Sequence, residues 1–437
     1  MAFQANQHRC NRSTGLSRNR SNNLRTVSLA AMIVVTAQAS ARFEEAVAGG
    51  FAIREQSAMS QGTSFAGSAA GDSLSSMFWN AAAASAVSGP GINVDSNYSV
   101  ISPFAEVTVD TIGGNSATPG FFGAESGDIA PPAIVGATYA SYQLSDKMFV
   151  GISLNSPFGL TTKPQNLNYA GNVLGRTSKL LTLNASPTIS YELFPGFFVG
   201  AGAQVQYADG KFSFASDLGP TQSTTFEGDD FAFGGTAGIL WKPSPATSIG
   251  LGYRSQLSHT LDGDFTTPGA TQSGEADVDL PDIVTLSMRQ SLAPNMRVMG
   301  TVEWSNWSRF EELAVTGVVS PDPIVIEANW DDGWFFSLGA EYDMPDGITW
   351  RAGVAYEISP VDAPEKRILG IPDSDRIWLS AGASFQLMPS TTVDLAYTHI
   401  FLENSEFSRS PIGSTTEFAG SIEAHTDIIS LGLKTRW

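Results

Sequence analysis

Phe197-Phe-Val-Gly-Ala-Gly-Ala-Gln-Val-Gln-Tyr207 is the stretch that decides the fold of this 437-residue chain. Its odd positions carry apolar side chains, whereas its even positions after Phe198 carry only glycine and glutamine. Successive side chains of a β-strand point to opposite faces, so this alternation gives the strand one apolar face and one small or polar face. The pattern predicts a sheet with a single apolar face.

Three later segments show the same alternation. Their apolar faces read Phe336, Leu338, Ala340 and Tyr342; Leu379, Ala381, Ala383, Phe385 and Leu387; and Ile429, Leu431, Leu433 and Trp437. The opposite faces are mostly small, polar or charged. Several apolar faces end in tyrosine or tryptophan, as an aromatic girdle at a membrane interface requires.

About fourteen such segments can be marked along the chain, an even number in the range of bacterial outer-membrane barrels. The predicted strands are 92–106, 131–145, 147–158, 177–194, 196–214, 229–243, 245–259, 281–293, 294–307, 330–344, 346–357, 374–388, 390–401 and 426–437.

Short turns alternate with long polar connections between these strands. The short turns lie at 145–146, 195–196, 242–245, 293–295, 344–347 and 388–390, and the long loops lie near 107–130, 159–176, 215–228, 260–280, 308–329, 358–373 and 402–425. A membrane barrel has short periplasmic turns and long outer loops, whereas a soluble sandwich would not place every long loop at one end. A closed barrel also leaves no unpaired strand edge in lipid. We therefore predict an all-β fold, a transmembrane antiparallel β-barrel formed by residues 92–437.

The composition excludes several other classes of protein. The chain has 24 Lys+Arg against 43 Asp+Glu, a formal net charge of −19, which argues against nucleic acid as a partner. Hydrophobic residues make up 42% of the chain and charged residues only 15%, which excludes intrinsic disorder. Repeated apolar runs of about 20 residues, which a bundle of membrane helices needs, are absent from the sequence.

The first 48 residues predict an export signal. Five arginines and no acid precede residue 26, and an apolar stretch follows at Val27–Ala37. Small residues at 39–41 and 46–48 suit cleavage near 41 or 48. Cys10 is the only cysteine, so no intrachain disulfide and no cysteine-based metal site can form. The predicted location is the outer membrane of a Gram-negative bacterium.

Residues 49–91 predict a different kind of segment. They are rich in alanine, serine and glycine, and alternation is largely missing. Folded into short helices inside the lumen, the segment would act as a hatch that plugs the barrel. The alternative is a disordered periplasmic tail, which its phenylalanine, tryptophan and methionine content disfavours.

Several blocks of the sequence resemble one known family. They are Gly50–Ala58 with Phe78–Ala82, Ser156–Thr162 with Tyr169–Gly171, Asp279–Asp282 with Trp304–Phe310, Arg351–Tyr356, and Ile371–Gly382. In this order they resemble the outer-membrane long-chain fatty-acid transporter family, also known as the FadL, OMPP1 or toluene-channel family. The resemblance covers essentially the whole chain after the export signal.

The resemblance implies a monomeric barrel plugged by an N-terminal hatch. The implied ligand is a long-chain fatty acid or a related hydrophobic compound, caught at the outer loops, held beside the hatch and released sideways at a kink in the third strand. The hatch positions that carry the resemblance are Gly50, Phe51, Glu55, Ser57, Gly62, Asn80, Ala81 and Ala82. The family has a proline after the asparagine of the hatch, and Ala81 stands in its place.

Ser156, Pro157, Phe158 and Gly159 are the predicted lateral opening. Proline donates no ladder hydrogen bond, and glycine often marks a bend in a strand. An ordinary strand end entering a loop would use the same residues.

Lys211, Arg309 and Arg376 are the candidates that the resemblance implies for binding a ligand carboxylate. Lys211 lies near one position where the family has a basic residue, and Arg309 and Arg376 lie in resembling blocks. Inward arginines often pair with lumen acids instead, and Glu303, Glu341 and Asp394 are such acids. An uncharged hydrocarbon would need no basic anchor.

No catalytic, metal or cofactor site is predicted. The four histidines are scattered, and no nucleophile motif or phosphate-binding glycine loop is present. The predicted partners are the hydrophobic ligand, membrane lipid with lipopolysaccharide, and the barrel-assembly machinery, which would recognise the C-terminal strand ending in Trp437. The alternatives to transport are an outer-membrane lipid hydrolase and a structural or adhesin barrel.

Overall fold

A computed structural model describes residues 50–117, 123–215, 222–317 and 324–437. The predicted export signal and residue 49 lie outside the described residues. Among the described helices, none has the length and apolarity needed to cross a membrane.

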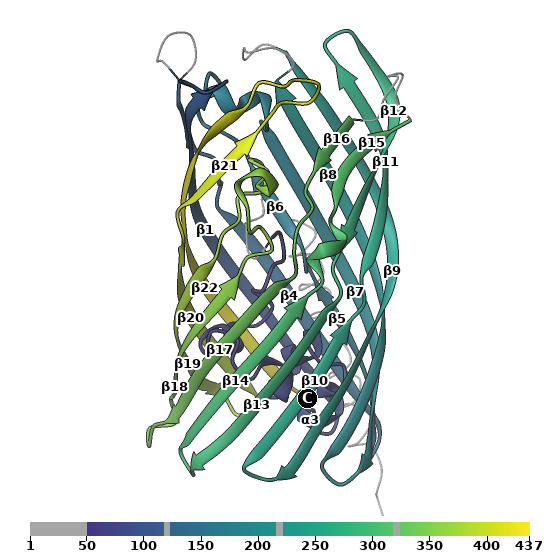
Figure 1. Ribbon diagram of the computed structural model, residues 1–437. Coiled ribbons are helices and arrows are strands. Elements are labelled where there is room, and N and C mark those ends of the chain that lie inside the picture. Colours follow the sequence, from purple (N-terminus) through teal and green to yellow (C-terminus); the bar gives the residue numbers. More distant parts are fainter. Residues whose placement is uncertain (1–49, 118–122, 216–221, 318–323) are drawn as a thin grey trace, which may run out of the picture. The chain divides into compact units, whose positions relative to one another are not determined.

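The described strands close into an antiparallel barrel with 14 wall positions (Figure 1). In chain order these are β1 (Ile92–Ile112), β4 (Ala133–Ser145), β5 (Met148–Asn155) with β6 (Gly159–Thr162), β7 (Thr177–Phe194), β8 (Phe197–Ala215), β9 (Ser223–Ser244), β10 (Thr247–Arg254) with β11 (Leu257–Thr267), β12 (Ala270–Leu280) with β13 (Ile283–Ala293), β14 (Met296–Ser305), β17 (Gly333–Asp343), β18 (Thr349–Ile358), β19 (Arg376–Met388), β20 (Thr391–Leu402) and β22 (Phe418–Arg436). β22 pairs with β1 along almost its whole length, so the sheet has no free edge there.

Short elements decorate the barrel. At the outer end these are β2 (Asn115–Ser116), β3 (Glu125–Asp128), η3 (Ala170–Val173), η4 (Trp307–Arg309), β15 (Glu312–Thr316), β16 (Ile324–Glu327), η5 (Pro364–Lys366) and β21 (Ser405–Arg409). The N-terminal segment, defined here as residues 50–91, contains α2 (Ala58–Gln61), η1 (Ser68–Ala70), η2 (Leu74–Phe78) and α3 (Ala83–Val87).

The predicted transmembrane barrel and its six short turns are confirmed. Some strands reach further into the predicted loops than expected: β1 extends to Ile112 where 92–106 was predicted, and β22 begins at Phe418 where 426–437 was predicted. The prediction of a loop near 260–280 is wrong, because β11 and β12 form a continuous hairpin there. In this hairpin the apolar residues Leu257, Leu261 and Phe265 point inward and are buried. The hairpin rises into water beyond the lipid, so its outward face is polar and lacks the pattern used to mark strands.

The outward wall is apolar, as the alternation predicts. Phe336 and Leu338 are 40% and 68% exposed, whereas the neighbouring Phe335 is 1% exposed and faces the lumen. Exposed aromatic residues lie near both ends of the wall, for example Tyr342 and Trp350 near the short turns. At the other end Tyr253, Tyr356 and Tyr397 each donate a hydrogen bond of 2.7 Å to an aspartate. This arrangement matches a lipid-facing band between two aromatic girdles.

The N-terminal segment packs against the inner wall, where it is drawn in purple in Figure 1. Nearly all of its residues from Phe51 to Ala84 are buried. Inward glycines of the wall lie directly against its backbone: a Cβ on Gly252 would overlap the carbonyl of Trp79, and one on Gly353 would overlap Thr63. The small inner face of the strands is therefore the surface that receives this segment.

Candidate ligand site and wall opening

The third wall position is interrupted where the sequence places the predicted opening. β5 ends at Asn155 and β6 begins at Gly159, with Pro157 between them. β5 pairs with both β4 and β7, whereas β6 pairs with β7 alone among the described strands. The hydrogen-bond ladder between β4 and the third wall position therefore ends with β5 and does not continue along β6.

The start of the N-terminal segment lies against the interruption and takes over part of its hydrogen bonding. The amide of Ile53 donates to the carbonyl of Pro157, and the amide of Gly159 donates to the carbonyl of Phe51, both at 2.8 Å. Ala52 and Phe158 form an antiparallel bridge. The segment thus acts as a short extra strand behind the break.

Phe51 is the centre of an aromatic cluster formed with Phe158, Trp307, Phe310 and Trp330. The ring centroid of Phe51 lies 4.7 Å from that of Trp307, 5.5 Å from Phe310, 6.0 Å from Trp330 and 6.3 Å from Phe158. Gly50, with φ of +64°, lies beneath the Trp307 ring, where a Cβ would come within 2.8 Å. The cluster offers an apolar, aromatic surface directly beside the interrupted strand.

A buried charged layer adjoins this cluster. Arg54 binds Glu303 at 2.5 Å and Glu357 at 3.1 Å. Glu357 also accepts a hydrogen bond from Trp378 at 3.1 Å, and Arg376 lies 3.7 Å away from it. The two carboxylates that accept hydrogen bonds from Arg54 neutralise its charge.

Glu55 lies beside this layer without such a partner. It is 2% exposed, and no described side chain donates a hydrogen bond to its carboxylate oxygens. Burial raises the pKa of Glu55 to about 7, against the smaller opposing effects of nearby backbone amides and of Arg54.

The cavity between the aromatic cluster and the charged layer is small. Its volume is about 20 Å³, and its lining includes Arg54, Phe78, Trp79, Pro157, Ile283 and Trp307. A space of this size holds about one water molecule. The cavity is therefore too small for an acyl chain.

The outer end of the barrel has a larger cavity of about 330 Å³, whose lining is both apolar and polar. Its lining includes Val173, Leu174, Ile326, Ile368, Leu369 and Arg409. Arg409 donates to the backbone carbonyls of Glu365 and Glu327, at 2.5 and 2.8 Å. Glu327 and Glu365 also line this cavity, so it combines apolar side chains with both acidic and basic ones. It was not found from the sequence, because its residues come from four separate loops.

Each predicted carboxylate-binding residue already has an acidic neighbour. Lys211 binds Glu227 at 2.7 Å, and Arg309 binds Asp282 at 3.0 Å. Arg376 is fully buried and contacts Asp373 and Glu357. None of the three lines the small cavity.

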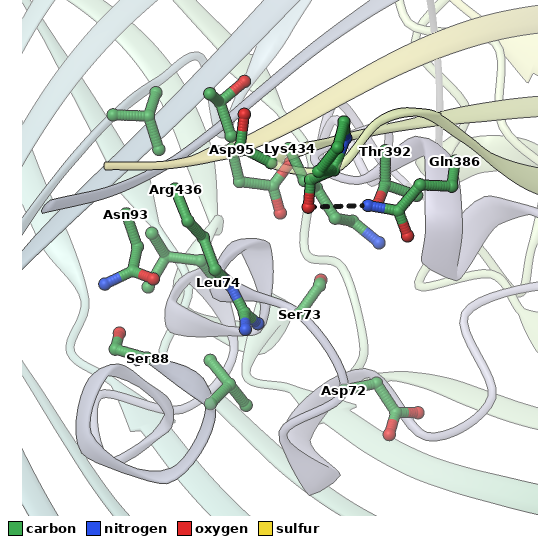
Figure 2. A pocket seen from close by; sticks show the side chains of 15 residues that line it. Asp72, Ser73, Leu74, Ser88, Asn93, Asp95, Gln386, Thr392, Lys434 and Arg436 are labelled. Atoms are coloured by element: carbon green, nitrogen blue, oxygen red, sulfur yellow. Dashed lines mark hydrogen bonds between the residues drawn. The ribbon is translucent and has the colours of Figure 1, made fainter. Parts of the chain in front are cut away.

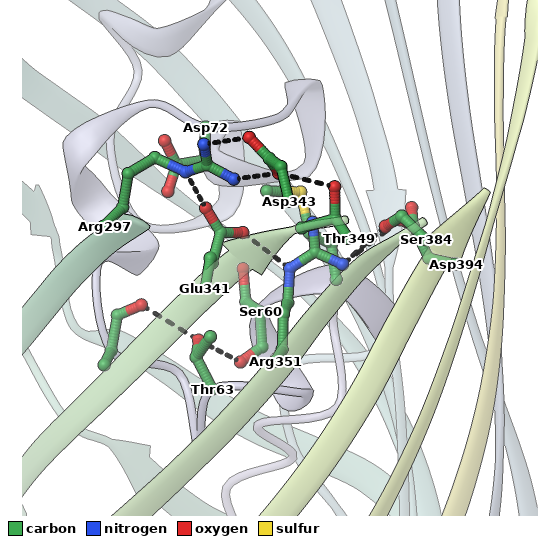
Figure 3. Close-up of polar contacts among 12 residues, drawn as sticks. Ser60, Thr63, Asp72, Arg297, Glu341, Asp343, Thr349, Arg351, Ser384 and Asp394 are labelled. Carbon is green, nitrogen blue, oxygen red and sulfur yellow. Dashed lines mark hydrogen bonds and ion pairs between the residues drawn. The ribbon is translucent and has the colours of Figure 1, made fainter. Parts of the chain in front are cut away.

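A second ionic network lies toward the short-turn end (Figure 3). Glu341 binds Arg297 at 2.8 Å and Arg351 at 2.6 Å, and Arg297 also binds Asp343 at 2.5 Å. Arg289 joins this network to Asp72 of the N-terminal segment at 2.9 Å. These inward charges anchor the segment to the wall.

A polar cavity of about 490 Å³ lies near the same end, between the N-terminal segment and the wall (Figure 2). Asp72, Asp95, Lys434 and Arg436 line it. Asp95 is 1% exposed and accepts hydrogen bonds from the Ser75 amide and from Asn97. Its charged lining does not suit a hydrophobic ligand.

The remaining hatch positions have local structural roles. Ser57 caps α2 by accepting from the Ser60 amide at 3.2 Å, and Gly62 lies against Gly382 of the wall. The Asn80 side chain donates to the carbonyls of Ala69 and Ile239, at 2.8 and 2.9 Å, and accepts from the Ala82 amide at 3.0 Å. This side chain closes the turn in which Ala81 replaces the family's proline.

The sequence matches a family of outer-membrane proteins. The family model described as "Outer membrane protein transport protein (OMPP1/FadL/TodX)" matches residues 39–437. A long-chain fatty acid transport protein of Escherichia coli O6:H1 (strain CFT073) is 27% identical over 408 residues, covering 83% of this chain and 89% of that protein. The 47 kDa outer membrane protein of Pasteurella multocida (strain Pm70) is 26% identical over 432 residues, covering 91% and 96%.

Solved structures share the fold. A Pseudomonas aeruginosa FadL homologue matches with a TM-score of 0.81 at 20% identity, covering 89% of this chain and 99% of that chain. The P. putida toluene transporter TodX matches with a TM-score of 0.64 at 15% identity, covering 90% and 99%. At these identities the likeness supports the barrel fold.

Proposed function

Because the chain belongs to the OMPP1/FadL/TodX family of outer-membrane transporters for fatty acids and other hydrophobic compounds, we propose that it is a passive transporter for long-chain fatty acids or related hydrophobic compounds. In this proposal it is not an enzyme, acts as a monomer among lipid and lipopolysaccharide, and is inserted by the barrel-assembly machinery through the strand ending in Trp437.

The proposal begins with capture at the outer end. The cavity of about 330 Å³ supplies apolar side chains for an acyl chain and Arg409 for a head group, beside the acids Glu327 and Glu365. Each buried CH₂ favours such a site over water by about 0.8 kcal/mol, so an open aqueous pore would not serve this cargo. From there the ligand passes to the aromatic cluster around Phe51.

The interrupted third strand is the observation that carries the proposal. The hydrogen bonds of Ile53 and Gly159 across the break come from the N-terminal segment and not from a neighbouring wall strand. Movement of residues 51–56 would therefore free both the aromatic cluster and the gap in the ladder. Ligand then leaves sideways into the bilayer without crossing water, and the N-terminal segment acts as the hatch.

Uptake of labelled oleate and labelled toluene by whole cells tests this function. A strain lacking the protein should take up less of at least one compound, and the complemented strain should recover. Equal uptake of both compounds by the two strains would contradict transport and favour a structural or adhesin role.

A further inference from the structure

The connection between β18 and β19, residues 359–375, is a buried strap at the outer end of the barrel. Apart from the single turn η5 it contains no helix or strand, yet residues 367–374 are all buried. Connecting segments usually run over the surface, because a buried loop must find hydrogen-bond partners for its backbone. The strap therefore needs partners other than a strand ladder.

The side chain of Arg367, itself part of the strap, supplies several of these partners. It is 6% exposed, and it donates to the carbonyl of Asp373 at 2.9 Å and to that of Val361 at 3.1 Å. Its Nη1 donates to the carbonyl of Glu406 in β21. One guanidinium thus ties the two ends of the strap to each other and to β21, using the fork of donors that only arginine has.

The tip of the strap, Gly370, docks on the paired strands β6 and β7. Thr162 of β6 donates its hydroxyl to the carbonyl of Gly370 at 2.8 Å. Thr162 is paired with Ser178 of β7, and a Cβ on Gly370 would come within 2.0 Å of the Ser178 hydroxyl. Glycine is therefore required for this close approach. Since β6 is the outer part of the interrupted wall position, the tip rests a few residues beyond the break.

The strap lies between the outer cavity and the aromatic cluster. Ile368 and Leu369 line the outer cavity of about 330 Å³. Ile368 and Ile371 belong to the same buried core as Phe51, and Pro360 lines the small inner cavity. The two cavities have no lining residue in common. A ligand that travels from the outer cavity to the aromatic cluster must therefore pass the strap.

We propose that the strap is a gate between the outer cavity and the aromatic cluster, and that Arg367 is the positioning residue that holds it across the lumen. The inference rests on the proposed transport function. The gate opens when Gly370 leaves Thr162 and the tip moves away from β6 and β7. Segments that lack ladder hydrogen bonds open at a low cost compared with strands of the wall, so the strap can move while the barrel stays intact.

A disulfide that fixes the tip to the wall tests the gate. A Cβ on Gly370 would lie 3.1 Å from the Cβ of Ser178, close to the roughly 3.5–4.5 Å that a disulfide needs. The double variant Ser178→Cys/Gly370→Cys also removes the hydroxyl that a side chain at the tip would meet. When oxidised it should take up labelled oleate and labelled toluene about tenfold more slowly than the wild-type protein, and dithiothreitol should restore uptake.

The matched control is Thr266→Cys/Thr271→Cys. These two hydroxyls lie 3.1 Å apart across the β11–β12 hairpin, where the residues are directly paired. A disulfide there forms at the outer end of the barrel without touching the strap, so uptake should be the same in the oxidised and reduced forms.

Arg367→Gln gives an independent measurement. Loss of the guanidinium should speed hydrogen exchange of residues 361–373. It should also raise uptake about fivefold, the change expected from the loss of one net hydrogen bond that holds the gate shut. Arg367→Lys should lie between the two. A merely structural role would lower uptake, so the direction of the change separates a loosened gate from a damaged barrel.

The outcomes separate the gate from the proposed function. Wild-type uptake by the oxidised Ser178→Cys/Gly370→Cys protein, with its disulfide verified by mass spectrometry, would overturn the gate and leave transport in place. A fall in uptake that dithiothreitol does not reverse would also count against the gate. If this disulfide does not form, faster exchange without faster uptake in Arg367→Gln would overturn it. If the wild-type protein carries neither compound, the proposed function itself fails.

Discussion

Single residues determine how tightly the N-terminal segment is held in the lumen. Gly50 adopts a positive φ beneath Trp307, where a side chain would collide with the indole ring. Asn80 makes three hydrogen bonds that fix the turn after η2. Glu55 acts in the opposite direction once it ionises, because its carboxylate is buried and no described side chain donates a hydrogen bond to it. Gly50 and Asn80 therefore help to hold the segment in place, whereas the buried carboxylate of Glu55 weakens its packing.

Glu55 gives a prediction about pH. Burial raises the pKa of this carboxyl from 4.5 to about 7, so the folded state binds more protons than the unfolded state between these values. The contribution of Glu55 to the free energy of unfolding is favourable at low pH and is lost as the pH rises through this window. The loss amounts to at most about 3 kcal/mol. Arg54, Glu357 and Arg376 are charged groups that also act on it.

Hydrogen exchange of residues 51–62, corrected for intrinsic rates, is the measurement. Protection should fall between about pH 5 and pH 8 in the wild-type protein, and Glu55→Gln should stay protected across this range. Equal loss of protection in both proteins would show that Glu55 does not cause the effect.

At the level of elements, the third wall position is built from two strands where its neighbours have one. Pro157 removes a ladder donor, and Thr182 of β7 bonds both the amide and the carbonyl of Phe158. The break is thus held in place from β7 on one side and from the N-terminal segment on the other. A frayed strand end would not be held by hydrogen bonds on both sides, so the break is a specific feature of the wall.

Gly159→Trp tests the opening. The bulky side chain should fill the space beside Phe51 and lower uptake of hydrophobic compounds about tenfold or more, while the rest of the wall still forms. Initial uptake rates report transport, and the heat-dependent gel mobility of folded barrels reports folding. Gly300→Trp, on the outward face of β14, is the control for added bulk. Normal transport by a folded Gly159→Trp protein would argue against a lateral exit.

For the whole molecule, the contents of the barrel explain the composition of its wall. Inward glycines make room for the backbone of the N-terminal segment, and inward charges pair across the lumen. The wall and the N-terminal segment are therefore complementary in shape and charge.

Removing the segment should open the lumen. Deletion of residues 50–85 should increase the entry of small polar solutes, because only side chains of the wall would then fill the barrel. Liposome swelling with sugars of graded size measures this leak. Gly252→Ala should cause a smaller leak, since its Cβ would overlap the carbonyl of Trp79. No change in swelling for the deletion would mean that the segment does not plug the barrel.

Local pattern was sufficient for the wall, because each lipid-facing strand must alternate and each turn must be short at one end. Thus the predicted strand 177–194 has the same bounds as β7. Leu338 was predicted on the apolar face of its strand, and it is exposed on the outward side of the wall. The β11–β12 hairpin was missed because above the lipid the outward face turns polar. The pairing of Arg54 with Glu303 and Glu357, and the hydrogen bond from Arg254 to the carbonyl of Phe78, join residues far apart in the chain. Only closure of the barrel around its own N-terminal segment decided which charges meet, since lumen contacts depend on register and not on neighbours in sequence.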